Sequence, residues 1–169
     1  MTTFINASNS SGLTFTSDNS GNVAFQSQGS NVLSFNTSGY ITTPLQPKFF
    51  GYRTAGLVSA TTTVLHNVVV TNVGSCYNSS TGIFTCPVAG YYEVFAGGHA
   101  ENSQPTVIQI QQNGTSIVSE YQNGSAYGSL TLTVILLCAA NDQIKSVVTS
   151  GTFWGGDNSG LRMSVKYLG

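Results

Sequence analysis

Few side chains in this sequence could carry out acid–base, nucleophilic or metal chemistry, and their spacing gives them little support. The 169 residues include two His, three Cys and six Asp plus Glu. His99 lies in Gly97-Gly-His-Ala-Glu101, so it could form an acid–base pair or half a metal site with Glu101. No His-x-His, His-x-x-x-His or Cys-x-x-Cys spacing supplies a further ligand. The pattern therefore favours a loop histidine near the rim of a sheet.

The cysteines could include a nucleophile, which would need an electropositive setting and a neighbouring base. Cys86 and Cys138 instead stand in strand-like patterns among apolar residues, which favours small buried hydrophobic side chains. The count of three, together with an N-terminus that does not resemble a signal peptide, predicts reduced thiols. A disulfide between Cys76 and Cys86 is not favoured by the register of the intervening turn.

Three glutamates, Glu93, Glu101 and Glu120, could be considered as the paired carboxylates of a glycosidase. No spacing brings two of them together. Glu93 alternates with the apolar Tyr92 and Val94, so it should point to the opposite face of its strand. A solvated or interface residue is the favoured interpretation. We therefore expect no catalytic residues.

The loops near the C-terminus suggest two kinds of recognition. Asp142 and Asp157 could bind calcium, although plain turns are favoured for both. Phe153 and Trp154 precede a Gly-rich loop and could contact a glycan or a receptor. The alternative, which is favoured, is that this aromatic pair packs inside the protein or at an interface between subunits.

Composition excludes several partners. Apolar residues make up 40% of the chain, but charged residues only 7%, with a net charge of −1. The five Lys and Arg residues are scattered, which argues against nucleic-acid binding. No apolar run is long enough to span a membrane, and no cofactor motif is present. We expect a protein made in a cytoplasm that works inside an assembly, where low charge is tolerated.

The pattern of residues is that of an all-β protein. Val, Ile, Thr, Tyr and Phe dominate, and Gly or Asn recurs about every ten residues. Asn113-Gly114 predicts a type I′ turn in a hairpin over residues 106–121. A sandwich or jelly roll is expected. The other predicted strands are residues 83–86, 91–100, 127–140, 143–150 and 161–168.

The N-terminal part carries a repeat with a spacing of ten residues. Each repeat holds two large apolar residues two positions apart, which would share one face of a strand. Their burial is small beside the entropy of ordering the segment, so it should order only against sister chains or a capsid surface. We assign residues 1–43 to this segment, 44–47 to a linker and 48–169 to a second domain. The six apolar residues are Leu13, Phe15, Val23, Phe25, Leu33 and Phe35.

Residues 77–95 read YNSSTGIFTCPVAGYYEVF and resemble the core motif of the C1q/TNF-like domain. Gln111-Gln-Asn-Gly114 and residues 136–144 are similar to later family segments, so the resemblance covers about residues 48–169. It implies a ten-strand jelly-roll sandwich that forms homotrimers, in a family whose members bind proteins or surfaces and are not enzymes. The matching motif positions are Tyr77, Asn78, Thr81, Gly82, Phe84, Thr85, Pro87, Gly90 and Tyr91 or Tyr92.

The order of segments resembles virion proteins of tailed bacteriophages, in which short repeats run through Ser38-Gly-Tyr-Ile-Thr-Thr-Pro44 into a C1q-like domain. This implies an N-terminal segment that packs between chains or attaches to capsid or tail proteins, and a projecting head. Three hypotheses remain: a capsid decoration or head fibre, a tail-fibre tip that binds a host glycan or receptor, and a C1q/TNF-like ligand or lectin outside a virus. The absence of a collagen-like stalk favours the first two.

Overall fold

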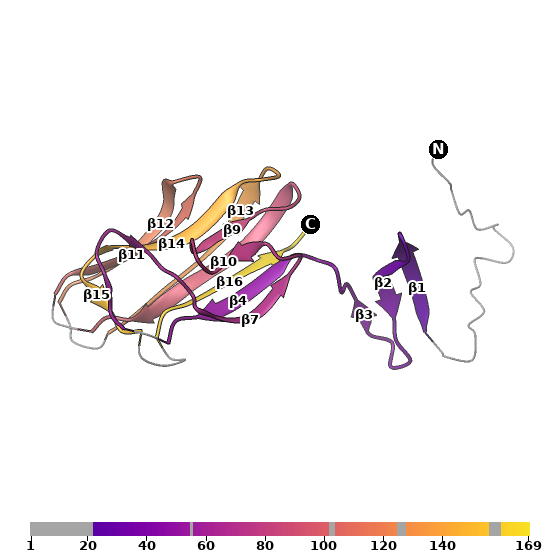
Figure 1. The fold of residues 1–169 in the computed structure, drawn as a ribbon, viewed down its shortest axis with the longest axis horizontal. Helices are drawn as coiled ribbons and strands as arrows, with labels where there is room; N and C mark the ends of the chain where they lie inside the picture. Colours follow the sequence, from indigo (N-terminus) through magenta and orange to yellow (C-terminus); the bar gives the residue numbers. More distant parts are fainter. Residues whose placement is uncertain (1–21, 55, 102–103, 125–127, 156–159) are drawn as a thin grey trace, which may run out of the picture. The chain divides into compact units, whose positions relative to one another are not determined.

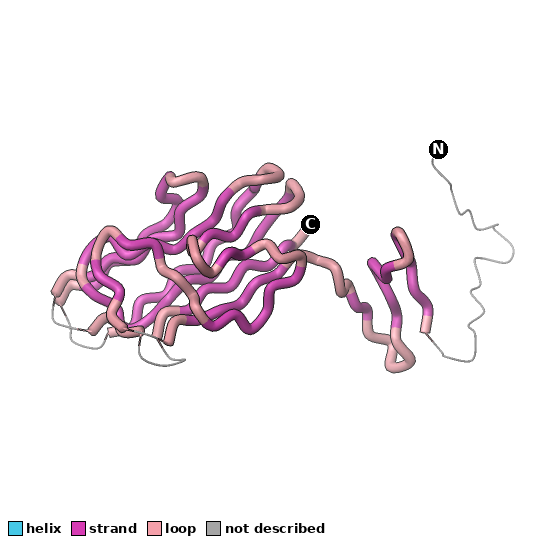
Figure 2. The backbone as a smooth tube through the Cα atoms, in the orientation of Figure 1, coloured by secondary structure: helices cyan, strands magenta, loops and turns pink. Residues whose placement is uncertain are grey.

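The computed structural model describes residues 22–54, 56–101, 104–124, 128–155 and 160–169. The chain divides into two compact units, residues 1–45 and 46–169. Every regular element in the described residues is a strand, as the tube in Figure 2 shows. The all-β prediction is therefore confirmed.

Two antiparallel sheets make up the C-terminal unit, and Figure 1 shows them as two layers. Along the chain, β10 (Gly90–His99) lies in the first sheet, the hairpin of β11 (Thr106–Gln112) and β12 (Thr115–Gln122) in the second, β13 (Ser129–Cys138) in the first and β14 (Gln143–Ser150) in the second. This alternation is the jelly-roll arrangement. Sheet I has the order β13 (Ser129–Cys138), β10 (Gly90–His99), β16 (Arg162–Tyr167), β4 (Lys48–Tyr52) and β7 (Val68–Val73). Sheet II has the order β12 (Thr115–Gln122), β11 (Thr106–Gln112), β14 (Gln143–Ser150), β9 (Ile83–Thr85) and β8 (Tyr77–Asn78), with β6 (Thr62–Thr63) also on β14. A small third sheet pairs β15 (Thr152–Phe153) with β5 (Val58–Ser59).

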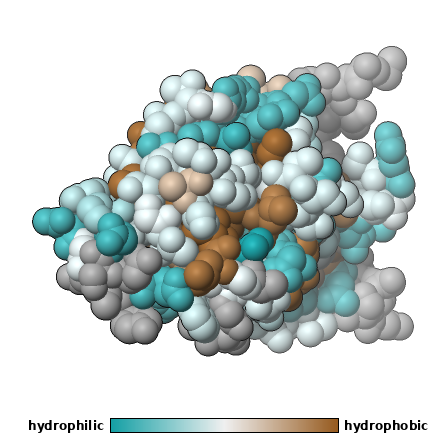
Figure 3. Space-filling model, turned by 60° about the vertical axis from the view of Figure 1, so that its left-hand side comes forward, coloured by the Kyte–Doolittle hydropathy of each residue, from teal (hydrophilic) through white to brown (hydrophobic). Residues whose placement is uncertain are grey.

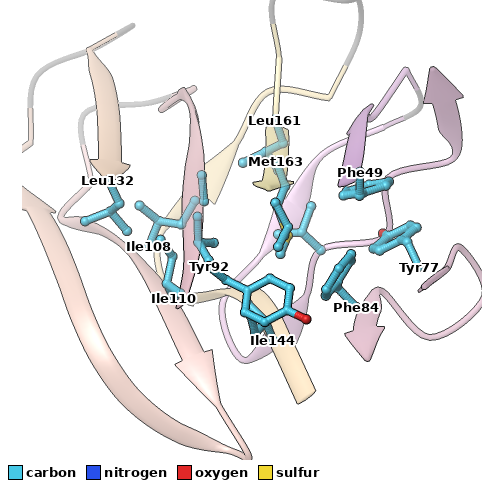
Figure 4. Packing of buried hydrophobic residues seen from close by; sticks show 14 of the residues in the cluster. Phe49, Tyr77, Phe84, Tyr92, Ile108, Ile110, Leu132, Ile144, Leu161 and Met163 are labelled. Carbon is cyan, nitrogen blue, oxygen red and sulfur yellow. The ribbon is translucent and has the colours of Figure 1, made fainter. Parts of the chain in front are cut away.

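The core lies between the two layers because alternate residues of each strand point inward. Tyr92 and Val94 of β10 are fully buried, and so are Ile108 and Ile110 of β11. Figure 4 shows such side chains from both sheets pointing toward one another. The Tyr92 hydroxyl remains satisfied inside the core because it donates to the backbone oxygen of Val88 at 2.8 Å.

The hairpin predicted from Asn113-Gly114 is confirmed. Both residues have positive φ, 53° and 82°, as a type I′ turn requires. Strands β11 and β12 pair on either side of this turn, with a bulge at Ile110/Gln111. The predicted strands β13, β14 and β16 also occur within two residues of the expected bounds.

The N-terminal unit is a three-stranded sheet in the order β1 (Val23–Ser27), β2 (Ser30–Phe35) and β3 (Ile41–Thr42). Gln28 and Gly29 both have positive φ and form the first turn, between β1 and β2. The second turn is held by the Asn36 side chain, whose oxygen accepts from the backbone N–H groups of Ser38 and Tyr40.

Candidate assembly surface

The outer face of sheet I carries exposed apolar side chains at one end. Tyr91 of β10 stands directly opposite Leu137 of β13. On its other side, Tyr91 exchanges backbone hydrogen bonds with Leu168 and Gly169. Leu137 is 66% exposed, and its neighbour on the same face, Ile135, is 61% exposed. Side chains of this size gain free energy when another surface removes them from water.

A row of charged residues crosses the same face. Glu93 of β10 stands between Ile135 and Lys166 of β16, and Lys166 stands opposite Lys48 of β4. All three charged side chains are exposed. Lys166 therefore has one neighbour of opposite charge, Glu93, and one of like charge, Lys48.

The next outward-facing row of sheet I, two residues further along β10, carries no charge. Phe95 of β10 and Phe50 of β4 flank Ser164 of β16, and Thr133 of β13 continues the row. We call the apolar, charged and second apolar rows together the sheet I outer face. Its alternation of apolar and charged strips is chemically suited to contact with another protein.

The N-terminal unit offers a second apolar surface. Cross-strand pairing sets Val23 opposite Phe35, Phe35 opposite Ile41, and Phe25 opposite Leu33. Paired residues point to the same side, so these five side chains share one face of the three-stranded sheet. Phe25, Phe35 and Ile41 are 39%, 37% and 63% exposed. We call this the repeat face.

The opposite side of the same small sheet carries polar groups that bond to each other. The hydroxyl groups of Ser34 and Thr42 are hydrogen-bonded at 2.6 Å, and Gln26 donates to Asn31 at 2.9 Å. The sheet is therefore two-sided, as the alternation within each repeat predicted. Leu13 and Phe15, the residues of the first repeat, lie outside the described residues.

The aromatic residues Tyr77, Phe84 and Tyr92 of the C1q-like motif belong to the core. Tyr77 stacks on Phe49 with ring centroids 3.8 Å apart, and Phe84 contacts Tyr92 edge-on at 6.0 Å. Tyr92, not Tyr91, is the buried member of its pair. Of the remaining motif positions, Gly82 is buried, Gly90 begins β10 half-buried, and Asn78 and Pro87 are exposed next to turns.

The aromatic pair at 153–154 is divided between core and surface. Phe153 is fully buried, whereas Trp154 is 41% exposed. The hypothesis that Phe153 contacts a partner is therefore wrong for this structure, because its ring packs in the core from β15. Trp154 alone can contact a ligand. Asp157 lies outside the described residues.

Each histidine has a hydrogen-bond partner on a neighbouring part of the fold. His99 ends β10 and is hydrogen-bonded through Nδ1 to Ser129 of the adjacent strand at 2.9 Å. His66 is fully buried, with Nδ1 3.0 Å from the Tyr77 hydroxyl. Burial, and then the charge of Arg53, lower the pKa of His66 to about 3. This imidazole is neutral at ordinary pH and belongs to the core.

The three cysteines are buried and unbridged, which agrees with the burial predicted for Cys86 and Cys138 and with the expectation of reduced thiols. Burial raises the pKa of each of Cys76, Cys86 and Cys138. For Cys86 the neighbouring Cys138 adds to that effect. Thiols held in this way are poor nucleophiles at neutral pH.

Asp142 acts as a clasp between two turns. Its carboxylate accepts hydrogen bonds from the side chains of Gln112 and Asn113 and from the backbone N–H of Ala139, each at 2.8 Å. The Asn113 bond, then the Ala139 and Gln112 bonds, lower the pKa of Asp142. With these protein donors in place, the turn interpretation fits better than a calcium site.

Across the described ranges, no group of three or more His, Cys, Asp or Glu residues could hold a metal ion. Nor does this part of the chain contain a helix long and apolar enough to cross a membrane. Figure 3 shows a surface that is mostly pale, with brown apolar groups interspersed among teal polar ones. The two candidate surfaces are therefore the sheet I outer face, with its apolar and charged rows, and the apolar repeat face.

A sandwich with this strand order, and with buried aromatic residues at the motif positions, is a jelly roll of the C1q/TNF class. Residues 49–152 match the family model of the C1q domain, and the chain belongs to that family.

Two solved structures share the fold. The globular domain of zebrafish complement 1qA protein superposes with a TM-score of 0.59 at 18% identity, over 73% of this chain and 96% of that one. Eiger TNF from S. frugiperda gives a TM-score of 0.60 at 12% identity, over 73% and 93%. The search of curated proteins finds no significant match. At these identities the likeness concerns the fold alone.

Proposed function

We propose that this protein is a non-enzymatic homotrimer that serves as a bacteriophage capsid decoration or head fibre, attached by its N-terminal segment and projecting its C1q-like head. The observation that carries the trimer is the sheet I outer face, where Tyr91, Ile135 and Leu137 form an exposed apolar end. Membership of the C1q domain family supports the same assembly.

The virion part of the proposal rests on the N-terminal segment. A repeat that presents one apolar face per unit needs a partner, and residues 19–47 contain no charged side chain. A segment with an apolar face and no charge is better suited to permanent burial in an assembly than to exposure to solvent. The alternative of a tail-fibre tip is favoured by one observation, the exposed ring of Trp154 beside a loop.

Assembly is tested by mass. Native mass measurement of the full chain at micromolar concentration should give three copies. The double variant Ile135→Glu/Leu137→Glu should be a folded monomer, because six added charges would meet at the seam of a trimer. Ile117→Glu is the matched control, since Ile117 is 44% exposed on β12 of the other sheet, and this variant should remain trimeric. A monomeric wild-type chain would refute the proposed assembly.

Location is tested by labelling. An antibody against the head, applied to purified virions and imaged, should mark the capsid at many copies per particle. Labels confined to the tail would replace this proposal by the tail-fibre alternative. Secretion of the protein from an uninfected cell would support a ligand or lectin outside a virus.

A further inference from the structure

We propose that the repeat face of one chain is covered by the repeat faces of its two sister chains, so that residues 22–42 form a three-sided β-prism with a dry core. This inference rests on the proposed trimer and names the partner that the repeat face takes. It differs from direct docking of this face onto a capsid protein. The particle would then be contacted by other parts of the N-terminal segment.

The chemistry of the face favours a copy of itself. Val23, Phe25, Leu33, Phe35 and Ile41 are all apolar and all lie on one side. The nearest charged residues in the sequence are Asp18 and Lys48. A surface without charge has no electrostatic preference for an unlike partner, and a purely apolar face is complementary to itself.

The size of the face fits three copies. Packed sheets lie about 10 Å apart, so each sheet of a prism would stand about 5 Å from the axis, and a triangle with that inner radius has sides of about 17 Å. Three strands at a spacing of about 4.8 Å make a sheet about 14 Å wide. Side chains as large as Phe25 and Phe35 can fill the space that remains near the axis.

Connection to the head favours sister chains over any other occupant. Residues 43–47 join β3 to β4, so a trimer of heads holds three repeat faces within a short linker of one another. Linkers of this length give effective concentrations in the millimolar range. A capsid protein would have to compete with that concentration for the same five side chains.

The experiment uses chymotrypsin on the full-length protein, with cleavage after Leu33 and Phe35 followed by mass measurement. In the wild-type trimer these bonds should be cut at least about tenfold more slowly than in the monomeric variant Ile135→Glu/Leu137→Glu, since the closed prism must open first. Phe25→Ser should remove the protection while the heads stay trimeric. Ala24→Ser changes the neighbouring residue on the opposite face and should leave the protection intact.

The outcomes separate the two proposals. A trimer by native mass that is cut as fast as the monomer would overturn the prism and leave the trimer standing. Protection that persists in the monomeric variant, or in Phe25→Ser, would also overturn it, because sister faces would not be its cause. A wild-type monomer would overturn both.

Discussion

At the scale of single residues, buried polar groups decide how the head responds to pH. The His66 imidazole and its backbone N–H both lie 3.0 Å from the Tyr77 hydroxyl. Its pKa of about 3 in the folded protein compares with 6.5 as the ordinary value. The unfolded chain therefore binds a proton in this range that the folded chain does not.

This difference predicts acid sensitivity from His66. Its contribution to stability is fully present above pH 6.5 and is lost as the pH falls from there toward 3, at up to about 1.4 kcal/mol per pH unit. Urea unfolding of the wild type and His66→Gln between pH 7 and pH 4 measures it. The wild type should show the steeper loss, and parallel curves would contradict the prediction.

Gly82 supports a second prediction, with Gly114 as its control. Both have positive φ, but an added Cβ at Gly82 would lie 2.6 Å from the Val64 oxygen, whereas nothing lies within 4 Å at Gly114. Gly114→Ala should cost roughly 1–2 kcal/mol of unfolding free energy from backbone strain alone. Gly82→Ala should cost about 1–3 kcal/mol more from the clash. Denaturant unfolding compares the two, and equal losses would show that the turn relaxes freely.

For single residues, the sequence predicts whether a side chain is buried better than it predicts which distant residue that side chain contacts. The alternation of polar and apolar residues around Glu93 correctly predicted that its side chain points away from the face that holds Tyr92 and Val94. The same reasoning does not separate the adjacent aromatic residues Phe153 and Trp154, because the burial of Phe153 depends on pairing with distant residues, Val58 of β5 and Ala100. His66 was not singled out from the sequence, since it lies between β6 and β7 and its partner Tyr77 comes from β8.

At the scale of elements, the Asp142 clasp joins the turn before β14 to the hairpin turn between β11 and β12. The side chain of Asn113 completes it by accepting from the backbone N–H of Gln143 at 2.9 Å. Two turns that are far apart in the sequence are thereby fixed to each other.

Asp142→Asn should lower the melting midpoint at pH 7, because an amide brings an N–H toward groups that are themselves donors. The pKa of Asp142 is lowered by folding, so the wild-type advantage exists above the ordinary value of 3.8 and is lost as the pH falls through the folded-state pKa. Thermal melts at pH 7 and below 3.8 test this, with Glu120→Gln as a control at an exposed carboxylate. An unchanged midpoint at pH 7 would count against the clasp.

The strands could be predicted because the pattern of apolar residues that marks a strand lies within the strand itself. The bounds of β14, for example, match the expected residues 143–150. Sheet membership could not be predicted, because the order β13-β10-β16-β4-β7 depends on pairings between distant segments. The run Val134-Ile-Leu-Leu places apolar side chains on both faces of β13. The pairing of β13 with β10 sets Leu137 opposite Tyr91 and Ile135 opposite Glu93, and this register could not be predicted from the sequence.

At the scale of the whole molecule, the two units should differ in independence. The buried apolar core of the described residues lies between Phe49 and Val165, so it belongs to the second unit. A fragment of residues 46–169 should therefore melt cooperatively near the midpoint of the full chain, and a fragment of residues 1–45 should show no cooperative transition. Differential scanning calorimetry distinguishes these results, and a head fragment that does not fold would contradict them.

The lack of Lys and Arg before residue 48 also determines where trypsin can cut the protein. Trypsin cleaves after Lys or Arg, and the first such residue is Lys48, at the exposed start of β4. Trypsin therefore cannot cut within residues 1–47 whatever their conformation, and cleavage after Lys48 would release residues 1–48 as one piece. One cleavage after Lys48 would separate the N-terminal unit from the C1q-like domain, so resistance of this bond to trypsin shows whether the two units stay joined in the presence of the protease.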